Sequence, residues 1–146
     1  MKKQIWFDMD GTLNRFYDVP NWLEMLINSD PTPYVIAEPM LNMSLLARYL
    51  NKLASMGWEL GVVSWLSKNS TPEYDELVKK AKIIWLEKHL KSVTFTTIHI
   101  VPYGTPKFNI CGGGILFDDE DKNRETWEDE AYEPSQIINI LKELVA

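Results

Sequence analysis

Two aspartates separated by one residue follow a short apolar run near the N-terminus. Asp8 and Asp10 lie in residues 8–13, Asp-Met-Asp-Gly-Thr-Leu, directly after residues 4–7. Two carboxylates at this spacing can share a small hard cation such as Mg²⁺. One of them can act as a nucleophile while the other transfers protons. Gly11 permits a sharp turn that leaves Asp8 accessible, although an ordinary Asp-Gly turn after a strand would show the same residues.

Other polar residues occur at comparable places further along the chain. Ser64 and the pair Asp118 and Asp119 each follow an apolar run, and Lys107 stands in a loop rich in proline and glycine. A hydroxyl with the amides after it can hold a phosphate oxygen, and a lysine can neutralise phosphate and nucleophile together. Singly, Ser64 fits a strand end and Lys107 a solvated loop. Together the acidic residues would crowd at one place, which is costly without a cation, so the set predicts a metal.

The elements that must position these residues follow from the apolar patterns. Short apolar runs without polar alternation predict buried strands at residues 4–7, 60–63, 98–101 and 114–117. Helical spacing predicts helices at about residues 22–27, 41–56, 72–88 and 134–144. This alternation predicts an α/β fold, a Rossmann-like three-layer α/β/α domain with a parallel sheet. Ligands of such sheets bind at the carboxyl ends of the strands, where Asp8, Ser64 and Asp118 are expected.

The chain length predicts one domain over residues 1–146. Residues 14–43 contain four prolines and several aromatic residues, and we expect them to form a small cap-like insertion. Aromatic side chains close to the predicted site either stack on a base or pack the insertion onto the domain, and both interpretations stay open. They are Phe16, Tyr17, Trp22 and Trp65.

The composition argues against several classes of partner and location. The net charge of −6 argues against a nucleic-acid polymer or an anionic membrane as the main partner. No run approaches the roughly 18 apolar residues of a membrane span, and Asp8 interrupts the first apolar run too early for a signal peptide. Cys111 is the single cysteine, so no intrachain disulfide is possible. We expect a cytoplasmic protein, with its oligomeric state open.

The motifs, taken together and in order, resemble those of the haloacid dehalogenase superfamily of phosphotransferases. The hexapeptide at residues 8–13 is similar to the first motif, Ser64 to the second, Lys107 to the third, and Asp118 with Asp119 to the fourth. The resemblance extends from residue 4 to about residue 123. It implies a Rossmann-like fold with a minimal or reduced cap.

The resemblance also implies a chemistry. Asp8 would form an aspartyl-phosphate, and Asp10 would protonate the leaving group and later activate water. Mg²⁺ would be the cofactor, held by Asp8, the Asp10 carbonyl oxygen and Asp118, with Asp119 as an alternative ligand.

Four residues are expected to hold the substrate. Ser64 and Lys107 would bind phosphate oxygens, and Thr12 and Trp65 complete the predicted phosphate- and substrate-binding set.

Within the superfamily the chain resembles the 5′(3′)-deoxyribonucleotidases more closely. The helix after Ser64 begins Pro-Glu-Tyr at residue 72 and ends Trp-Leu-Glu-Lys at residue 88, as in that group. However, Asp10 and Ser64 are only 54 residues apart, so the cap is much reduced. We therefore expect a Mg²⁺-dependent phosphomonoesterase for a small phosphorylated substrate, with a nucleoside monophosphate favoured. The alternative is a catalytically idle or regulatory module that binds Mg²⁺ and phosphate.

Overall fold

The structure, a computed structural model, describes residues 2–146. Its strands are β1 (Gln4–Phe7), β2 (Glu59–Trp65), β3 (Thr97–Val101), β4 (Ile115–Phe117) and β5 (Ala131–Tyr132). Its α-helices are α1 (Trp22–Ile27), α2 (Thr32–Ile36), α3 (Met43–Ser55), α4 (Pro72–His89), α5 (Lys107–Cys111), α6 (Asp121–Thr126) and α7 (Ile137–Val145). Two 3₁₀ turns, η1 (Phe16–Asp18) and η2 (Pro134–Gln136), complete the elements.

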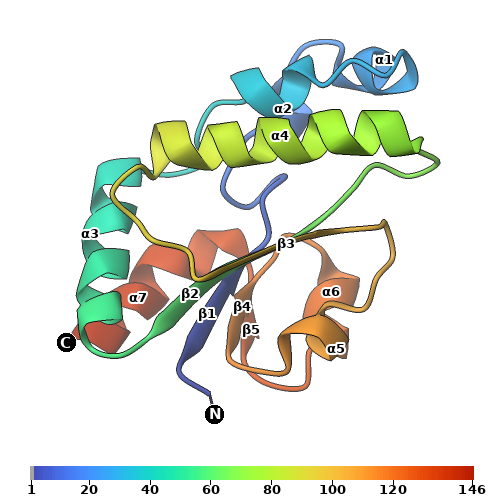
Figure 1. The fold of residues 1–146 in the computed structure, drawn as a ribbon. Helices are drawn as coiled ribbons and strands as arrows, with labels where there is room; N and C mark the ends of the chain where they lie inside the picture. The colour runs from blue at the N-terminus through green and yellow to red at the C-terminus, as the bar shows by residue number, and fades with distance from the viewer. Residues whose placement is uncertain (1) are drawn as a thin grey trace.

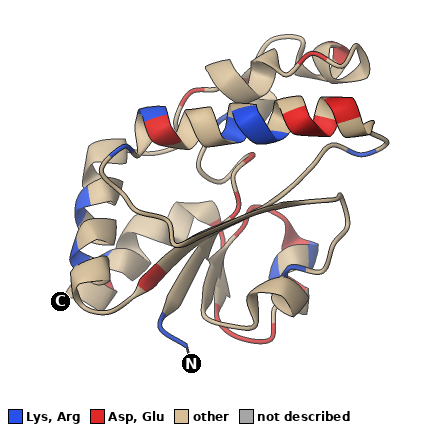
Figure 2. Cartoon of the chain, viewed as in Figure 1, with Lys and Arg blue, Asp and Glu red and all other residues tan. Residues whose placement is uncertain are grey.

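The five strands form one parallel sheet in the order β3-β2-β1-β4-β5. The chain builds outward from β1 through β2 to β3, and then returns to place β4 on the other side of β1. Such a reversal opens a crevice at the carboxyl ends of the two strands that flank it, which are β1 and β4. The acidic segments that follow β1 and β4 therefore meet at the same edge of the sheet, as Figure 2 shows.

Both faces of the sheet are covered by helices (Figure 1). Side chains alternate along each strand, so Ile5 and Phe7 enter the core beneath α3 and α7, whereas Trp6 faces the other side. There Trp6 packs with Cys111 of α5 and with Trp127. The predicted three-layer α/β/α fold with a parallel sheet is thus confirmed.

Helix α4 joins the sheet domain to the insertion at residues 14–43. Trp85, near its end, belongs to the main core, whereas Tyr74 and Val78 pack against Phe16 and Tyr34 of the insertion. In Figure 1, α1 and α2 lie along α4 on the side away from the sheet. The short insertion therefore rests on the same helix that packs against the sheet.

The four predicted strands and the four predicted helices are all present, with ends shifted by a few residues. The elements that the apolar patterns did not predict are short: β5, α2, α5 and α6. Lys107, expected in a loop, is the first residue of α5. Among residues 2–146, no helix combines the length and the apolar character needed to cross a membrane.

Candidate active site

The turn after β1 presents Asp8 at the centre of the site. The Asp8 amide donates to the Phe117 carbonyl oxygen at 2.9 Å, which ties the ends of β1 and β4 together. Gly11 has φ +83°, and a Cβ atom there would collide with the Asp119 carboxylate. The prediction that glycine shapes this turn is confirmed, because the backbone conformation and the close approach both disfavour a side chain. The turn leaves Asp8 less accessible than expected, at 7% exposed.

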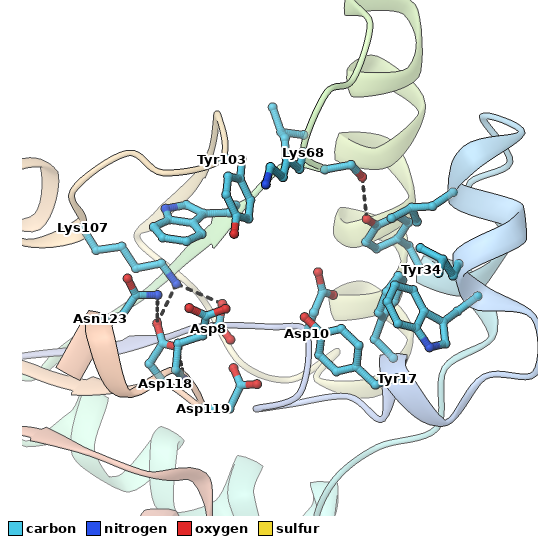
Figure 3. Close-up of a pocket in the computed structure, with 18 residues that line it drawn as sticks. Asp8, Asp10, Tyr17, Tyr34, Lys68, Tyr103, Lys107, Asp118, Asp119 and Asn123 are labelled. Carbon is cyan, nitrogen blue, oxygen red and sulfur yellow. Dashed lines mark hydrogen bonds and ion pairs between the residues drawn. The ribbon is translucent and has the colours of Figure 1, made fainter. Parts of the chain in front are cut away.

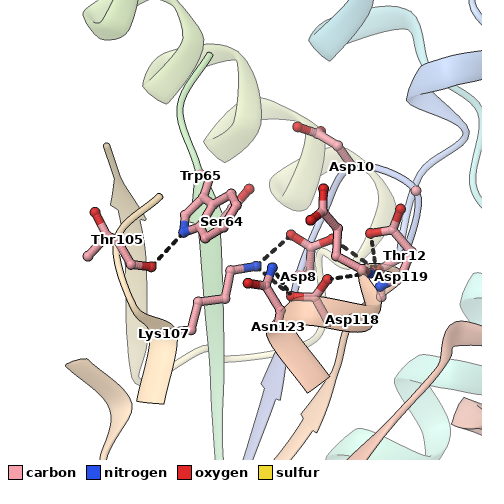
Figure 4. Close-up of polar contacts among 12 residues, drawn as sticks. Asp8, Asp10, Thr12, Ser64, Trp65, Thr105, Lys107, Asp118, Asp119 and Asn123 are labelled. Carbon is pink, nitrogen blue, oxygen red and sulfur yellow. Dashed lines mark hydrogen bonds and ion pairs between the residues drawn. The ribbon is translucent and has the colours of Figure 1, made fainter. Parts of the chain in front are cut away.

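Thr12 is buried and connects the two acidic segments (Figure 4). Its hydroxyl donates to Asp8 Oδ2 at 2.9 Å and accepts from the Asp119 amide at 3.1 Å. Thr12 was predicted among the phosphate- and substrate-binding residues, yet it is 0% exposed and holds two acidic neighbours in place. A phosphate contact of its own stays a prediction.

Lys107 lies between two carboxylates. Its ammonium is 3.0 Å from Asp8 Oδ1 and 2.7 Å from Asp118 Oδ2, and its side chain is almost fully buried. Burial alone would lower the pKa of Lys107, but the charges of Asp8 and Asp118 outweigh it and raise that pKa. Lys107 is therefore a fixed positive charge beside Asp8, where it can reach an oxygen of a phosphoryl group attached to that carboxylate.

Asp118 is held from three sides. Beyond Lys107, its Oδ2 accepts from Asn123 Nδ2 at 3.1 Å and its Oδ1 accepts from the Glu120 amide at 3.0 Å. Asn123 is buried and was absent from the predicted site. Helix α6 is polar throughout, so no apolar pattern marked Asn123 as an inward-facing residue.

Three carboxylates gather into one group. One oxygen from each of Asp8, Asp118 and Asp119 lies within 4.8 Å of the others. Burial and the charge of Asp8 raise the pKa of Asp118 to about 6 and that of Asp119 to about 8. For Asp8, burial acts to raise the pKa, but Lys107 and a hydrogen bond with Asp119 outweigh it and lower that pKa.

These residues fit a small divalent cation. Carboxylate oxygens are the ligands that Mg²⁺ prefers, and the pKa of Asp119 is raised by burial and by the negative charges of Asp8 and Asp118, which a bound cation would offset. Asp8, Asp118 and Asp119, all predicted as metal ligands, are brought together. The side chain of Asp10 lies outside this group, so its predicted share in metal binding would come from its backbone carbonyl, as expected from the resemblance.

Asp10 and Ser64 are instead brought together by a residue that the sequence analysis missed. Lys82 of α4 donates to Asp10 Oδ2 at 3.0 Å and to Ser64 Oγ at 2.6 Å, and its side chain is fully buried. Ser64 is itself buried and does not line the adjoining cavity, so its predicted contact with phosphate stays a prediction. A signal for Lys82 did exist, because it stands four residues after Val78 and three before Trp85, on the apolar face of α4.

A cavity of about 320 Å³ opens beside the carboxylates (Figure 3). Figure 3 shows Asp8 and Asp118 toward one side of it, and Tyr17 and Tyr34 toward the other. Aromatic residues supply much of its remaining wall, and they are Phe16, Tyr17, Trp22, Tyr34, Trp65 and Tyr103. The cavity thus combines an acidic, metal-suited end with an aromatic end.

The aromatic residues whose role the sequence left open fall into two groups, one that packs the insertion and one that lines the cavity. Phe16 is buried and packs on Tyr34, with ring centroids 4.5 Å apart, so it holds the insertion together. Tyr17 is half exposed and Trp22 is partly exposed, and both line the cavity.

Trp65 lies on the other wall of the cavity. Its Nε1 donates to the Thr105 carbonyl oxygen at 2.8 Å, which fixes the ring, and Lys107 Nζ lies 5.4 Å from the ring centroid. Trp65, predicted as a substrate-binding residue, therefore borders both the charged and the aromatic part of the site.

Comparison with known proteins gives a likeness among solved structures. No family model matches the chain, and neither does any curated protein sequence. Among solved structures, the chain is similar to the crystal structure of D,D-heptose 1,7-bisphosphate phosphatase from Burkholderia thailandensis. The TM-score is 0.54, the identity is 11%, and 99% of each chain is covered. This likeness agrees with the phosphotransferase-like motifs at the level of the fold and gives no support to the narrower nucleotidase resemblance.

Proposed function

We propose that this protein is a metal-dependent phosphomonoesterase that works through an aspartyl-phosphate. The observation that carries the proposal is the meeting of Asp8, Lys107, Asp118 and Asp119 beside one cavity. Asp8 has the lowered pKa of an ionised nucleophile, and a buried ammonium lies 3.0 Å from it. The fold shared with a solved phosphatase supports the same reaction class.

In the first half of the reaction, Asp8 attacks the phosphorus of the ester in line with the leaving oxygen. The bond from phosphorus to the ester oxygen breaks, and Asp10 transfers its proton to that oxygen, which leaves as an alcohol. Lys107 stabilises the charge on the equatorial phosphoryl oxygens. Asp8, Asp118 and the Asp10 carbonyl would hold Mg²⁺, which when bound offsets phosphate charge and orients the ester.

In the second half, water attacks the same phosphorus. Asp10, now ionised, accepts the proton of that water, the acyl-phosphate bond breaks, and inorganic phosphate leaves with Asp8 regenerated as a carboxylate. Asp10 therefore serves as acid first and base second. Its position two residues after Asp8 keeps it beside the same phosphoryl group in both halves.

We propose a nucleoside monophosphate as the favoured substrate class, on the support of the aromatic wall. Trp22 and Trp65 are partly exposed and both border the cavity. Trp22 belongs to the insertion, and Trp65 lies at the end of β2. Base stacking on such rings is worth on the order of 1–3 kcal/mol. The insertion at residues 14–43 acts in this proposal as a reduced cap, which leaves the site fairly open and the substrate range broad.

The proposal is tested by assaying purified protein against a panel of phosphate esters with Mg²⁺, and again after removal of metal with EDTA. We expect hydrolysis with Mg²⁺, loss with EDTA and recovery when Mg²⁺ is restored. Ca²⁺ should be a poor substitute, because it takes more ligands at longer distances and would bind both oxygens of Asp8. Absence of hydrolysis across the panel would favour the idle or regulatory alternative.

Substrate class is tested with Trp22→Ala and Trp65→Ala. If these rings stack on a base, kcat/KM for a deoxynucleoside monophosphate falls about tenfold or more in each variant, while that for a plain sugar phosphate changes little. Ile27→Ala, at an exposed position on the same helix as Trp22, is the matched control. An equal fall for both substrates would leave the aromatic residues with a packing role, and a sugar phosphate preferred by the wild type would contradict the nucleotide proposal.

A further inference from the structure

Lys82 is a buried lysine that the steps above do not use. It belongs to α4, its side chain is 0% exposed, and it is absent from the cavity lining. A lysine ammonium is costly to bury unless its charge and its donors are satisfied. The contacts of Lys82 therefore indicate what the residue is for.

All three ammonium protons of Lys82 have an acceptor. Nζ donates to Asp10 Oδ2 at 3.0 Å, to Ser64 Oγ at 2.6 Å and to the Trp65 carbonyl oxygen at 2.8 Å. An ammonium has three donors, so none is left over. Two of the acceptors belong to the end of β2, a central strand, and they fix the ammonium in space. The third is the Asp10 carboxylate, which the ammonium then fixes in turn.

The surroundings hold this arrangement in place and keep water out. The ring of Tyr34, from α2 of the insertion, lies 5.1 Å from Lys82 Nζ, and its hydroxyl is hydrogen-bonded to Ser67 at 2.7 Å. The other oxygen of Asp10 accepts from Asn14 Nδ2 at 3.3 Å. Both oxygens of Asp10 thus have a partner, and Lys82 is the closer and the charged one.

We infer that Lys82 is a positioning residue that holds Asp10 where it can transfer protons to and from the reacting phosphate ester. This inference rests on the proposed function and goes beyond it, because Lys82 is absent from the cavity lining and reaches the proton transfers through Asp10. Catalytic groups need a rigid supporting shell to stay in a productive geometry. Here the shell connects α4, the end of β2 and the turn after β1, three segments that are far apart in the sequence.

If Lys82 positions Asp10, its loss should affect alkyl and aryl phosphate esters differently. An alkyl phosphate has a poor leaving group that needs a proton from Asp10, whereas a nitrophenyl phosphate has a good one that does not. Misplacing Asp10 should therefore slow the first step for the alkyl ester and spare it for the aryl ester. It should slow the second step for both, because water activation needs the same carboxylate.

The test compares Lys82→Met with wild type and with Lys80→Met, a control at an exposed position on the same helix. For the alkyl ester, we expect the single-turnover rate of Lys82→Met to fall about 100-fold or more, the usual contribution of general acid–base catalysis. For the aryl ester, we expect a burst of nitrophenol near the wild-type rate, followed by slow turnover and a phosphoenzyme that accumulates. Lys80→Met should behave as wild type with both esters.

Thermal unfolding of each variant separates catalysis from folding. Lys82→Arg keeps the charge and changes the shape of the donor group, so it provides the same comparison if Lys82→Met does not fold. Equal losses for both esters in the folded variant, or failure of both variants to fold, would show that Lys82 does not act by placing Asp10 and would overturn the inference. A wild-type protein that hydrolyses neither ester would overturn the proposed function, and the role of Lys82 with it.

Discussion

The carboxylates of Asp8 and Asp119 share one cluster, yet they hold protons very differently. Lys107 and the hydrogen bonds around Asp8 outweigh its burial and lower its pKa. Within residues 2–146 no ion pair to Asp119 is formed, and burial with the negative charge of Asp8 raises its pKa to about 8. An ionised carboxylate is the form that can attack phosphorus. The local charges therefore select Asp8 as the nucleophile and leave Asp119 to bind a proton or a cation.

The first residue-scale prediction is that Asp8→Asn abolishes turnover and leaves the fold intact. The amide cannot attack phosphorus, so kcat should fall about 10⁴-fold or more, as when other enzymes lose a nucleophile. Lys107 keeps Asp118 as a partner at 2.7 Å, and one negative charge leaves a crowded cluster, so the Tm should stay the same or rise. The measurements are steady-state hydrolysis and thermal unfolding.

Detection of the phosphoenzyme distinguishes this role from simple binding. Acid quenching of the wild type during turnover should trap phosphate on the peptide that contains Asp8, and the Asp8→Asn protein should trap none. Asp18→Asn, at a side chain that is 71% exposed, serves as the control and should match the wild type. Substantial hydrolysis by Asp8→Asn would rule out the covalent route.

The residues of the site could be predicted from sequence where each stands at a strand end. Asp8, Ser64 and Asp118 follow apolar runs, and that placement is visible without coordinates. Asn123 could not be recognised in this way, because it lies on the polar helix α6 and reaches the site only through the packing of that helix. Lys82 lies on the apolar face of α4, which indicates burial, but its partners at the site follow only from the packing of α4. From sequence alone, a polar side chain on a polar helix is expected to face solvent, and only its tertiary contacts show otherwise.

At the scale of elements, the turn between β1 and η1 sets the geometry of the acidic cluster. Gly11→Ala should strain this turn, since a left-handed conformation costs roughly 1–2 kcal/mol for a residue with a side chain, and the new Cβ would displace Asp119. We expect a Tm lower by about 4 °C or more. We also expect kcat to fall, because Asp10 and Thr12 flank Gly11.

A second glycine provides the matched control for this variant. Gly57 has φ +95° at the end of α3, but nothing lies within 4 Å of a Cβ placed there. Gly57→Ala therefore carries the backbone strain without the collision, and it should lower the Tm while kcat stays at the wild-type value. If both variants lose activity in proportion to stability, the turn at Gly11 has no special role in the site.

The elements differ in how far the sequence predicts them, and the number of apolar residues that each contains is the reason. α3, α4 and α7 have nine or more residues and present repeated apolar positions, so periodicity identifies them. β5 has two residues and α5 has five, too few to show any period. These short elements form because the sheet and its neighbours supply partners for them, as when β5 pairs with β4 and becomes the edge strand. Their existence is thus a property of the tertiary structure.

At the scale of the whole molecule, the topology explains why so few residues can build the site. β1 lies between β2 and β4, so the segments that follow all three strands meet around Asp8. α4 spans from the main core to the insertion, and Lys82 lies where these two parts meet. The position of Asp10 therefore depends on the packing of the insertion as well as on its own turn. We expect the stability of the molecule and the chemistry of the site to be coupled.

The acidic cluster gives one such coupling, because the protonation of Asp119 makes the stability of the whole molecule depend on pH and on metal. A carboxyl whose pKa is raised on folding contributes stability at low pH and loses it as pH rises through the folded value. Asp119, with its pKa raised to about 8, should therefore lower the Tm by a few °C between about pH 7 and pH 9 in the metal-free protein. Asp8, whose pKa is lowered, stays ionised across this range and contributes a constant amount.

Divalent cation should flatten this trend, because it favours the ionised form of Asp119. Mg²⁺ at about 100 times its Kd stabilises a protein by about 2.7 kcal/mol, and the gain in Tm should be larger at pH 9 than at pH 7. The measurement is thermal unfolding at both pH values, with EDTA and with Mg²⁺. Asp119→Asn removes the titrating group and should flatten the metal-free dependence. If the slope of the Tm against pH is the same in Asp119→Asn as in wild type, another group is responsible and the acidic cluster is not the source of the coupling.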